Sequence, residues 1–285
     1  MSATNSIAPI HIEEDGVLLT NEKLVTTLNR FFLTINEDIP TLNLSELPAY
    51  LPVADQLPTI HPYQICKKLL SLNPSKAASP DNIPPRILKE FAYELSDPLA
   101  DIFNLSLASA TTPSHWNCAN ISPIPKESLP KDKNDLRPIS LMSCISKVLE
   151  EFVVEWILED IGHQIDPKQF GCLRGLSTTV CLLDMFHSWL SKLDAGGCSL
   201  RIVLLDFSKA FDRINLNVLI TKLIDMGLRR SLIPWLCDFL SNRKQRVKLG
   251  ESISEWAQVS AGVPQGTKLG PILFLVMVND LKTLE

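Results

Sequence analysis

The chain has 285 residues, of which 45% are apolar and 21% are charged. These proportions are those of a folded globular protein, and they exclude a disordered, collagen-like or coiled-coil chain. The net charge of −5 excludes a molecule covered in positive charge. Residues 1–120 carry seven basic and thirteen acidic side chains, whereas residues 121–285 carry 20 and 19. Any anionic partner is therefore expected to contact the second part.

The cysteines and the hydropathy pattern indicate the compartment. Seven widely spaced cysteines favour buried free thiols in a reducing environment. The first residues lack the apolar core of a signal peptide. The longest apolar run, residues 271–278, is far shorter than the about 20 residues that a membrane-spanning helix needs. The sequence predicts a soluble intracellular protein, in the nucleus or the cytoplasm, without membrane contact.

The first part of the chain is rich in proline. Sixteen of the twenty prolines lie at or before Pro138, where they disfavour long helices and central strands. Residues 1–60 are typical of a connector that contains one short helix over 21–35. Beyond it the pattern predicts a helix over 63–72, a turn over 80–84, one helix over 87–110 or two broken at Pro98, and a strand over 119–125.

The second part predicts more helix than strand. Ser177 is a candidate N-cap for one of its helices. Apolar residues at helical spacing predict helices over 139–161, 177–193, 215–226, 231–240 and 270–281. Residues 200–205 lack alternation and predict a strand buried on both faces. A hairpin through Gly250 is expected to join 246–249 to 256–259. The expected class is α+β, rich in helix, with a small antiparallel sheet.

Asp206 lies at the carboxyl end of the predicted buried strand. A carboxylate fixed there suits a divalent cation such as Mg²⁺, whose remaining ligands come from a substrate phosphate. The alternative is that Asp206 caps a helix beginning at Ser208. This segment alone leaves the two interpretations equally open. Asp212 is expected to be a solvated residue in the first turn of that helix.

Further segments combine glycine or proline with basic side chains. Residues 262–271 contain three glycines and two prolines, which predicts a stiff loop whose backbone approaches a flat ligand closely, or merely a tight turn. Arg137, preceded by Lys126, Lys131 and Lys133, and Arg174 lie in or beside loops at helix starts, where phosphate binds readily. One further basic cluster is expected either to track a nucleic-acid backbone or to be solvated: Arg229, Arg230, Arg243, Lys244, Arg246 and Lys248.

In this order, the segments resemble those of a reverse transcriptase of non-LTR (LINE-type) retrotransposons. The matching stretches run from residue 80 to 85, 103 to 106, 136 to 150, 169 to 178, 205 to 212 and 262 to 274. The resemblance covers roughly residues 60–285 and implies the fingers and part of the palm of a right-hand polymerase. The expected domains are a linker over 1–60, a helical pre-fingers region over 61–120, and the reverse transcriptase domain over 121–285.

The resemblance implies a role for each matching residue. Asp206 would be the first metal-binding aspartate of a two-metal, Mg²⁺-dependent polymerase. Phe211 would exclude nucleotides that carry a ribose 2′-hydroxyl. Gln265 would contact the incoming dNTP, and Lys126 and Arg137 would neutralise its triphosphate, with Lys131 and Lys133 as alternatives to Lys126. Arg174 and Gly266 would contact nucleic acid. The implied partners are an RNA template, a DNA primer and dNTPs; the oligomeric state is left open.

One departure from the family pattern concerns catalysis. The family's second metal site is a pair of adjacent aspartates, and no such pair occurs in this chain. One carboxylate does not hold two Mg²⁺ ions about 3.5–4 Å apart. We therefore expect a C-terminally truncated reverse transcriptase without polymerase activity. The alternative is a non-catalytic nucleic-acid-binding or protein-interaction remnant of a retrotransposon.

Overall fold

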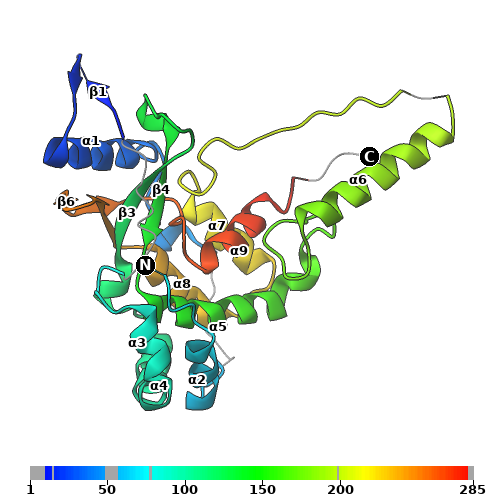
Figure 1. The fold of residues 1–285 in the computed structure, drawn as a ribbon. Coiled ribbons are helices and arrows are strands. Elements are labelled where there is room, and N and C mark those ends of the chain that lie inside the picture. Colours follow the sequence, from blue (N-terminus) through cyan, green and yellow to red (C-terminus); the bar gives the residue numbers. More distant parts are fainter. Residues whose placement is uncertain (1–9, 15, 49–56, 77–78, 198, 282–285) are drawn as a thin grey trace.

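The computed structural model describes residues 10–14, 16–48, 57–76, 79–197 and 199–281 (Figure 1). Helices form most of its regular secondary structure: α1 (Asn21–Thr34), α2 (Pro62–Leu70), α3 (Pro85–Glu90), α4 (Ala92–Ala108), α5 (Cys144–Ile161), α6 (Thr178–Asp194), α7 (Leu216–Asp225), α8 (Ile233–Leu240) and α9 (Leu269–Val278). The strands are β1 (Glu13–Glu14), β2 (Val17–Leu18), β3 (Cys118–Pro125), β4 (Leu136–Leu141), β5 (Arg243–Leu249), β6 (Ser252–Ile253) and β7 (Ala257–Val259). The predicted combination of many helices with little strand is confirmed.

The main sheet has five strands in the order β4-β3-β5-β6, with β7 also paired to β5. Strands β3 and β4 are antiparallel, from Asn120 opposite Leu141 to Pro125 opposite Leu136. Strands β3 and β5 are parallel, which corrects the expectation of a purely antiparallel sheet. The two strands are far apart in the chain and are joined through several helices, and such a crossover permits parallel pairing. The predicted hairpin through Gly250 is confirmed, because β6 and β7 both pair antiparallel to β5.

One hydrophobic core runs through the molecule, from Ile10 to Val276. Helix α1 buries Leu24, Val25 and Leu28, and it packs against β5 and β6. Helix α5 contacts α2 on one side and α9 on the other. Helix α5 also contributes the largest set of buried side chains of any helix to this core.

Two predicted helices begin or break elsewhere than expected. The break between α3 and α4 lies at Phe91, whose backbone (φ −101°, ψ 30°) leaves the helical region, and Pro98 lies inside α4. Residues 139–141 belong to β4, and α5 begins only at Cys144. The strand is favoured there because β3 supplies a complete antiparallel partner, which apolar spacing does not reveal.

The predicted buried strand over 200–205 is wrong. These residues have no regular secondary structure, and Val203, Leu204 and Leu205 are 79%, 82% and 89% exposed. A strand needs a neighbour for its backbone N–H and C=O groups, and no described strand pairs with this segment. The segment is therefore an isolated extended stretch, visible in Figure 1 between α6 and the body of the molecule.

Helix α6 also projects from the body (Figure 1). Ser177 accepts a hydrogen bond from the backbone N of Val180 at 3.3 Å, which confirms the predicted N-cap. None of its residues is buried, and Leu183 and Phe186 are more than half exposed. Within the described part of the chain, no helix is long and apolar enough to cross a membrane.

Candidate functional site

The segment Gly262–Lys268, called here the glycine loop, is held by backbone hydrogen bonds to two distant segments. The N–H of Gly262 donates to the carbonyl of Ile214 at 3.0 Å, and the N–H of Val263 donates to that of Phe211 at 2.9 Å. On the other side, the N–H of Ser140 in β4 donates to the carbonyl of Gln265 at 2.7 Å. The loop thus joins three of the segments that the sequence singles out: 136–140, 205–212 and 262–271.

Two glycines permit this close approach. A Cβ atom on Gly262, whose φ is +80°, would lie 2.5 Å from the backbone oxygen of Asp212. A Cβ atom on Gly266, whose φ is +117°, would lie 2.7 Å from the backbone oxygen of Ser140. Because both backbones are fixed by hydrogen bonds, neither position accepts a larger residue without displacement of its neighbour. The loop is tight, and the neighbour that it approaches closely is protein backbone; the predicted approach to a flat ligand stays a prediction.

Asp212 is an acid whose side chain contacts this loop directly. Its Oδ2 accepts a hydrogen bond from Nε2 of Gln265 at 2.8 Å. Burial raises the pKa of Asp212 to about 6, while the hydrogen bond from Gln265 and the charges of Lys209 and Lys126 oppose the rise. The expectation of a solvated side chain in a first helical turn is wrong, since residues 208–213 form turns and the carboxylate is largely shielded by the glycine loop.

Two lysines act on Asp212, Lys209 from the same turn and Lys126 from the end of β3. The Nζ of Lys126, just after β3, donates to the carbonyl of Asn134 at 2.7 Å, and its charge acts on Asp212. Lys209 lies with its Nζ 4.8 Å from the ring centroid of Phe31 in α1, and burial lowers its pKa. Lys133, an alternative to Lys126 at the sequence level, instead pairs with Glu14 at 2.6 Å. Lys126 is therefore the lysine of this group whose charge reaches the loop.

Phe211 packs against α9. Its ring centroid lies 5.2 Å from that of Phe274, and Phe207 contacts the same ring edge-on at 5.9 Å. Phe274 therefore fixes the side chain of Phe211 beside the glycine loop, because the backbone of Phe211 already bonds Val263.

The start of α9 is capped from α5. Glu150, which is fully buried, accepts hydrogen bonds through Oε2 from the N–H of Lys268 at 2.7 Å and that of Leu269 at 3.3 Å. Thr267 Oγ1 accepts from the N–H of Gly270 at 2.8 Å. Burial raises the pKa of Glu150, opposed by these backbone donors and by the charge of Arg243. The end of the glycine loop is therefore fixed by a carboxylate as well as by backbone contacts.

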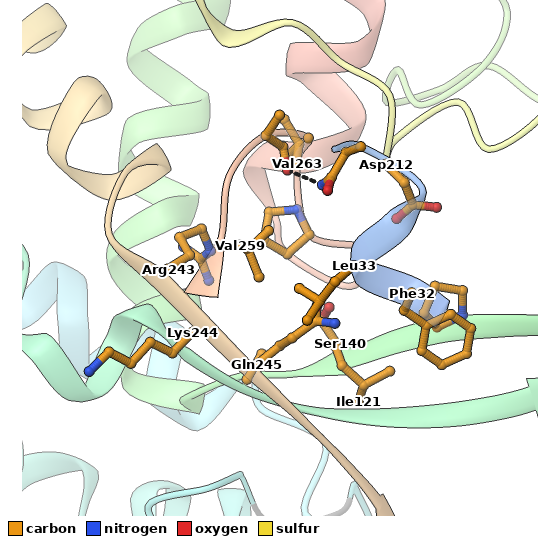
Figure 2. Close-up of a pocket in the computed structure, with 16 residues that line it drawn as sticks. Phe32, Leu33, Ile121, Ser140, Asp212, Arg243, Lys244, Gln245, Val259 and Val263 are labelled. Atoms are coloured by element: carbon orange, nitrogen blue, oxygen red, sulfur yellow. Dashed lines mark hydrogen bonds between the residues drawn. The ribbon is translucent and has the colours of Figure 1, made fainter. Parts of the chain in front are cut away.

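A cavity lies beside the loop (Figure 2). In this view Asp212 and Phe32 lie on the right and Arg243 and Lys244 on the left, with Ser140 between them. Arg243 is only 3% exposed; its Nη1 donates to the carbonyl of Phe239 at 2.9 Å. Burial lowers the pKa of Arg243 to about 10, opposed by Glu150. The cavity therefore has a carboxylate at one wall and basic groups at the other.

The basic cluster expected over 229–248 is not one continuous face. Arg229 is paired with Asp160 at 2.6 Å, and Arg243 is buried. The guanidinium of Arg246 stacks on the ring of Trp256 at 4.3 Å. Each of these three side chains already contacts another part of the protein. They therefore do not belong to a continuous basic strip that could follow a nucleic-acid backbone.

The remaining predicted site residues are less well joined. Arg137 is exposed on β4, three residues before Ser140, and Arg174 is exposed in the loop before α6. Asp206 is exposed in the extended segment, and within the described part of the chain its carboxylate forms no hydrogen bond or ion pair with the glycine loop. No helix begins at Ser208, which removes the interpretation of Asp206 as a helix cap. The structure thus brings together Phe211, Gln265 and Gly266, with Lys126 near.

The acidic residues do not form a metal site. Among the residues that the structure describes, no three His, Cys, Asp or Glu side chains lie close enough to hold a metal ion. Asp206 has no second carboxylate fixed beside it, so the described residues do not fit the two-metal site that the resemblance implies. The Mg²⁺ expectation stays a prediction.

The sequence analysis assigned no role in the site to Asp212, Lys209 or Glu150. Asp212 could have been found, because it directly follows Phe211 in a segment already singled out. Glu150 carries no sequence signal of its own, because an acid within an amphipathic helix is ordinarily on the surface.

The glycine loop thus joins the partly buried Phe211–Asp212 segment to β4 within a mixed domain of helices and a small sheet. Comparison with known families identifies this domain: the model of the reverse transcriptase (RNA-dependent DNA polymerase) family matches residues 124–284. That match spans more than half of the chain and all the segments of this site. The chain belongs to the reverse transcriptase family.

Its relatives come from mobile elements. The chain is 29% identical over 279 residues to a probable RNA-directed DNA polymerase from transposon BS of Drosophila melanogaster, covering 94% of this chain and 30% of that protein. It is 30% identical over 210 residues to the RNA-directed DNA polymerase from mobile element jockey of the same fly, covering 71% and 22%. A Pol polyprotein from the R2 element of Popillia japonica is 24% identical over 178 residues, covering 62% and 25%. The chain thus spans less than a third of the length of these relatives.

Proposed function

We propose that this chain is the fingers and partial palm of a non-LTR retrotransposon RNA-directed DNA polymerase, and that it supplies the face that receives the incoming dNTP. The observation that carries this assignment is the junction at the glycine loop, where Ser140, Phe211 and Gln265 share backbone hydrogen bonds. A loop with this many fixed contacts offers a preorganised surface, which costs little reorganisation when a ligand binds.

The residues around the loop have distinct roles in this assignment. Phe211, held by Phe274, excludes a ribose 2′-hydroxyl by steric clash. Gln265 contacts the nucleotide, and its amide is oriented by Asp212. Lys126 and Arg137 neutralise the triphosphate, and Gly266 and Arg174 contact template or primer. The domain division into 1–60, 61–120 and 121–285 belongs to the same proposal.

Catalysis by this stretch alone is not expected. Asp206 lies on an exposed segment with no strand beside it, so its carboxylate is not held in one position. A two-metal polymerase needs its ligands fixed within a few tenths of an ångström of the productive geometry. We therefore propose that this chain binds nucleotide and nucleic acid without extending a primer.

Primer extension on an RNA template with Mg²⁺ and dNTPs tests this assignment, with binding of the same primer–template measured in parallel. The chain is expected to bind the primer–template with an affinity that falls steeply as the salt concentration rises. It is not expected to extend the primer, so wild type and Asp206→Asn should give the same result. Extension that depends on Asp206 would contradict the proposed lack of catalysis. A binding constant that does not change with salt would remove phosphate contacts and favour a protein-interaction role.

The alternative is a purely non-catalytic remnant that binds nucleic acid or protein. The exposed apolar side chains of α6 favour it, because they leave a surface on which another protein could pack. Binding of primer–template without any binding of dNTP would support this alternative over a nucleotide site.

A further inference from the structure

A second cavity, of about 380 Å³, has no lining residue in common with the cavity of Figure 2 and includes only Lys268 of the glycine loop. It is formed where the connection after α2, the end of β4 and the first turns of α5 meet. Three lysines from three segments line it together with one carboxylate and small polar side chains: Lys76, Lys147, Lys268, Glu151, Ser71, Asn73 and Ser79. None of the residues to which the family resemblance assigns a role lines this cavity.

Lys147 is the central group of the cavity. It lies in the first turn of α5, partly buried, and its ammonium forms no hydrogen bond or ion pair with any described residue. Burial lowers the pKa of Lys147; Glu150 opposes this, and the like charges of Lys76 and Lys268 add to it. A desolvated ammonium without a partner is costly and is kept where it serves a ligand.

The nearby carboxylates do not neutralise this charge. Glu150 is committed to the start of α9, where it accepts from Lys268 N and Leu269 N. Glu151 pairs with the Nζ of Lys268 at 2.6 Å and with that of Lys68 at 3.6 Å. The ammoniums of Lys147 and Lys76 therefore remain in excess at the cavity, which makes it a site for an anion.

We propose that this cavity binds a phosphate group, with Lys147 as the central ligand and Lys76 and Lys268 at the rim. The two unpaired ammoniums of Lys147 and Lys76 give this opening an excess of positive charge, and lysine binds phosphate oxygens as a point charge that needs no fixed donor geometry. The phosphate belongs either to the backbone of a single-stranded polynucleotide or to a free nucleotide. Binding here requires no polymerase chemistry, so it is tested apart from the proposed function.

The test measures binding to fluorescein-labelled single-stranded RNA by anisotropy at several salt concentrations, and binding of dATP and inorganic pyrophosphate by calorimetry. The variants are Lys147→Met and Lys76→Gln, with Lys23→Gln as the control that removes one charge from the exposed face of α1. Lys147→Met is expected to weaken binding about tenfold and Lys76→Gln a few-fold, whereas Lys23→Gln changes it less than about twofold.

The salt dependence and the stability add independent readouts. If the phosphate comes from a polynucleotide, Lys147→Met reduces the slope of log affinity against log salt by about 0.7. Lys147→Met is also expected to raise the urea midpoint, because it removes an unpaired, partly buried charge; a purely structural lysine would lower it when replaced.

The outcomes separate the ligand sources. RNA binding that depends on Lys147 assigns the site to a polynucleotide, and a Lys147 dependence confined to dATP or pyrophosphate assigns it to a nucleotide. If Lys147→Met and Lys76→Gln bind all three ligands like Lys23→Gln, the phosphate site is refuted, and this result leaves the primer-extension test of the proposed function unaffected.

Discussion

Asp212→Asn is expected to stabilise the protein at neutral pH and to have almost no effect in acid. The pKa of Asp212 is raised from 3.8 to about 6 by burial, so the folded protein binds more protons than the unfolded chain between these values. Stability must then fall as pH rises through this window, because the folded state increasingly carries a shielded, ionised carboxylate. Asparagine keeps the side-chain shape and still accepts a hydrogen bond from Gln265, but it carries no charge.

The magnitude follows from the width of the window. One pH unit corresponds to about 1.4 kcal/mol for one group, so the span from 3.8 to about 6 corresponds to an upper limit of about 3 kcal/mol. Residual solvent at the partly exposed side chain reduces this, and we expect a gain of roughly 2 kcal/mol above about pH 7. Near pH 4 the gain should be below about 1 kcal/mol, because wild-type Asp212 is then protonated when folded.

The assay is urea unfolding of wild type and Asp212→Asn at about pH 4 and about pH 7.5. Asp160→Asn is the control of opposite sign. Burial would raise the pKa of Asp160, but hydrogen bonds and charge from Arg229 lower it, so Asp160 stabilises the fold above its unfolded pKa and loses this effect in acid. Asp160→Asn should therefore destabilise at neutral pH. An Asp212→Asn gain that is equal at both pH values, or a loss at neutral pH, would refute the reasoning.

Three further changes test the support of the site. Gly266→Ala should lower the free energy of unfolding by about 2 kcal/mol or more, because the φ of Gly266 is positive and the added Cβ would meet Ser140. Gly171→Ala, where the added Cβ meets open space, is the control, and equal urea midpoints for the two variants would argue against the close approach. Glu150→Ala should lower the free energy of unfolding by about 3 kcal/mol. Glu150→Gln should lower it less, because the amide oxygen still caps α9, and the reverse order would contradict the capping role. Amides of 199–207 should exchange fastest of the described chain by hydrogen-exchange mass spectrometry, whereas strong protection there would mean that the segment is paired.

Much of the local structure was predictable from the sequence. Apolar spacing located α1 and α7 to within one or two residues, and the side chain of Ser177 predicted the start of α6. The glycines and prolines of 262–271 predicted a close-approach loop that opens a helix. In each case the signal lies within the segment itself, because helix periodicity, capping and positive φ are local properties.

Features that depend on distant partners were not predictable. An apolar run such as 200–205 reads as a buried strand, yet a strand forms only where a neighbour offers backbone hydrogen bonds. The shielding of Asp212 comes from Gln265, 53 residues further along the chain. Glu150 accepts from backbone groups 118 and 119 residues away. None of these partners is apparent from the sequence near the residue concerned.

The most direct test of the nucleotide site is the affinity of the chain for dATP relative to ATP, in wild type and in Phe211→Val, with Phe186→Val on the exposed helix α6 as the control. If Phe211 excludes the ribose 2′-hydroxyl, wild type prefers dATP, and Phe211→Val reduces that preference by roughly tenfold while binding dATP almost as well. Phe186→Val should keep the wild-type preference. Equal affinities for dATP and ATP in wild type, or a preference that Phe211→Val leaves unchanged, would contradict the assignment of this face to deoxynucleotide binding.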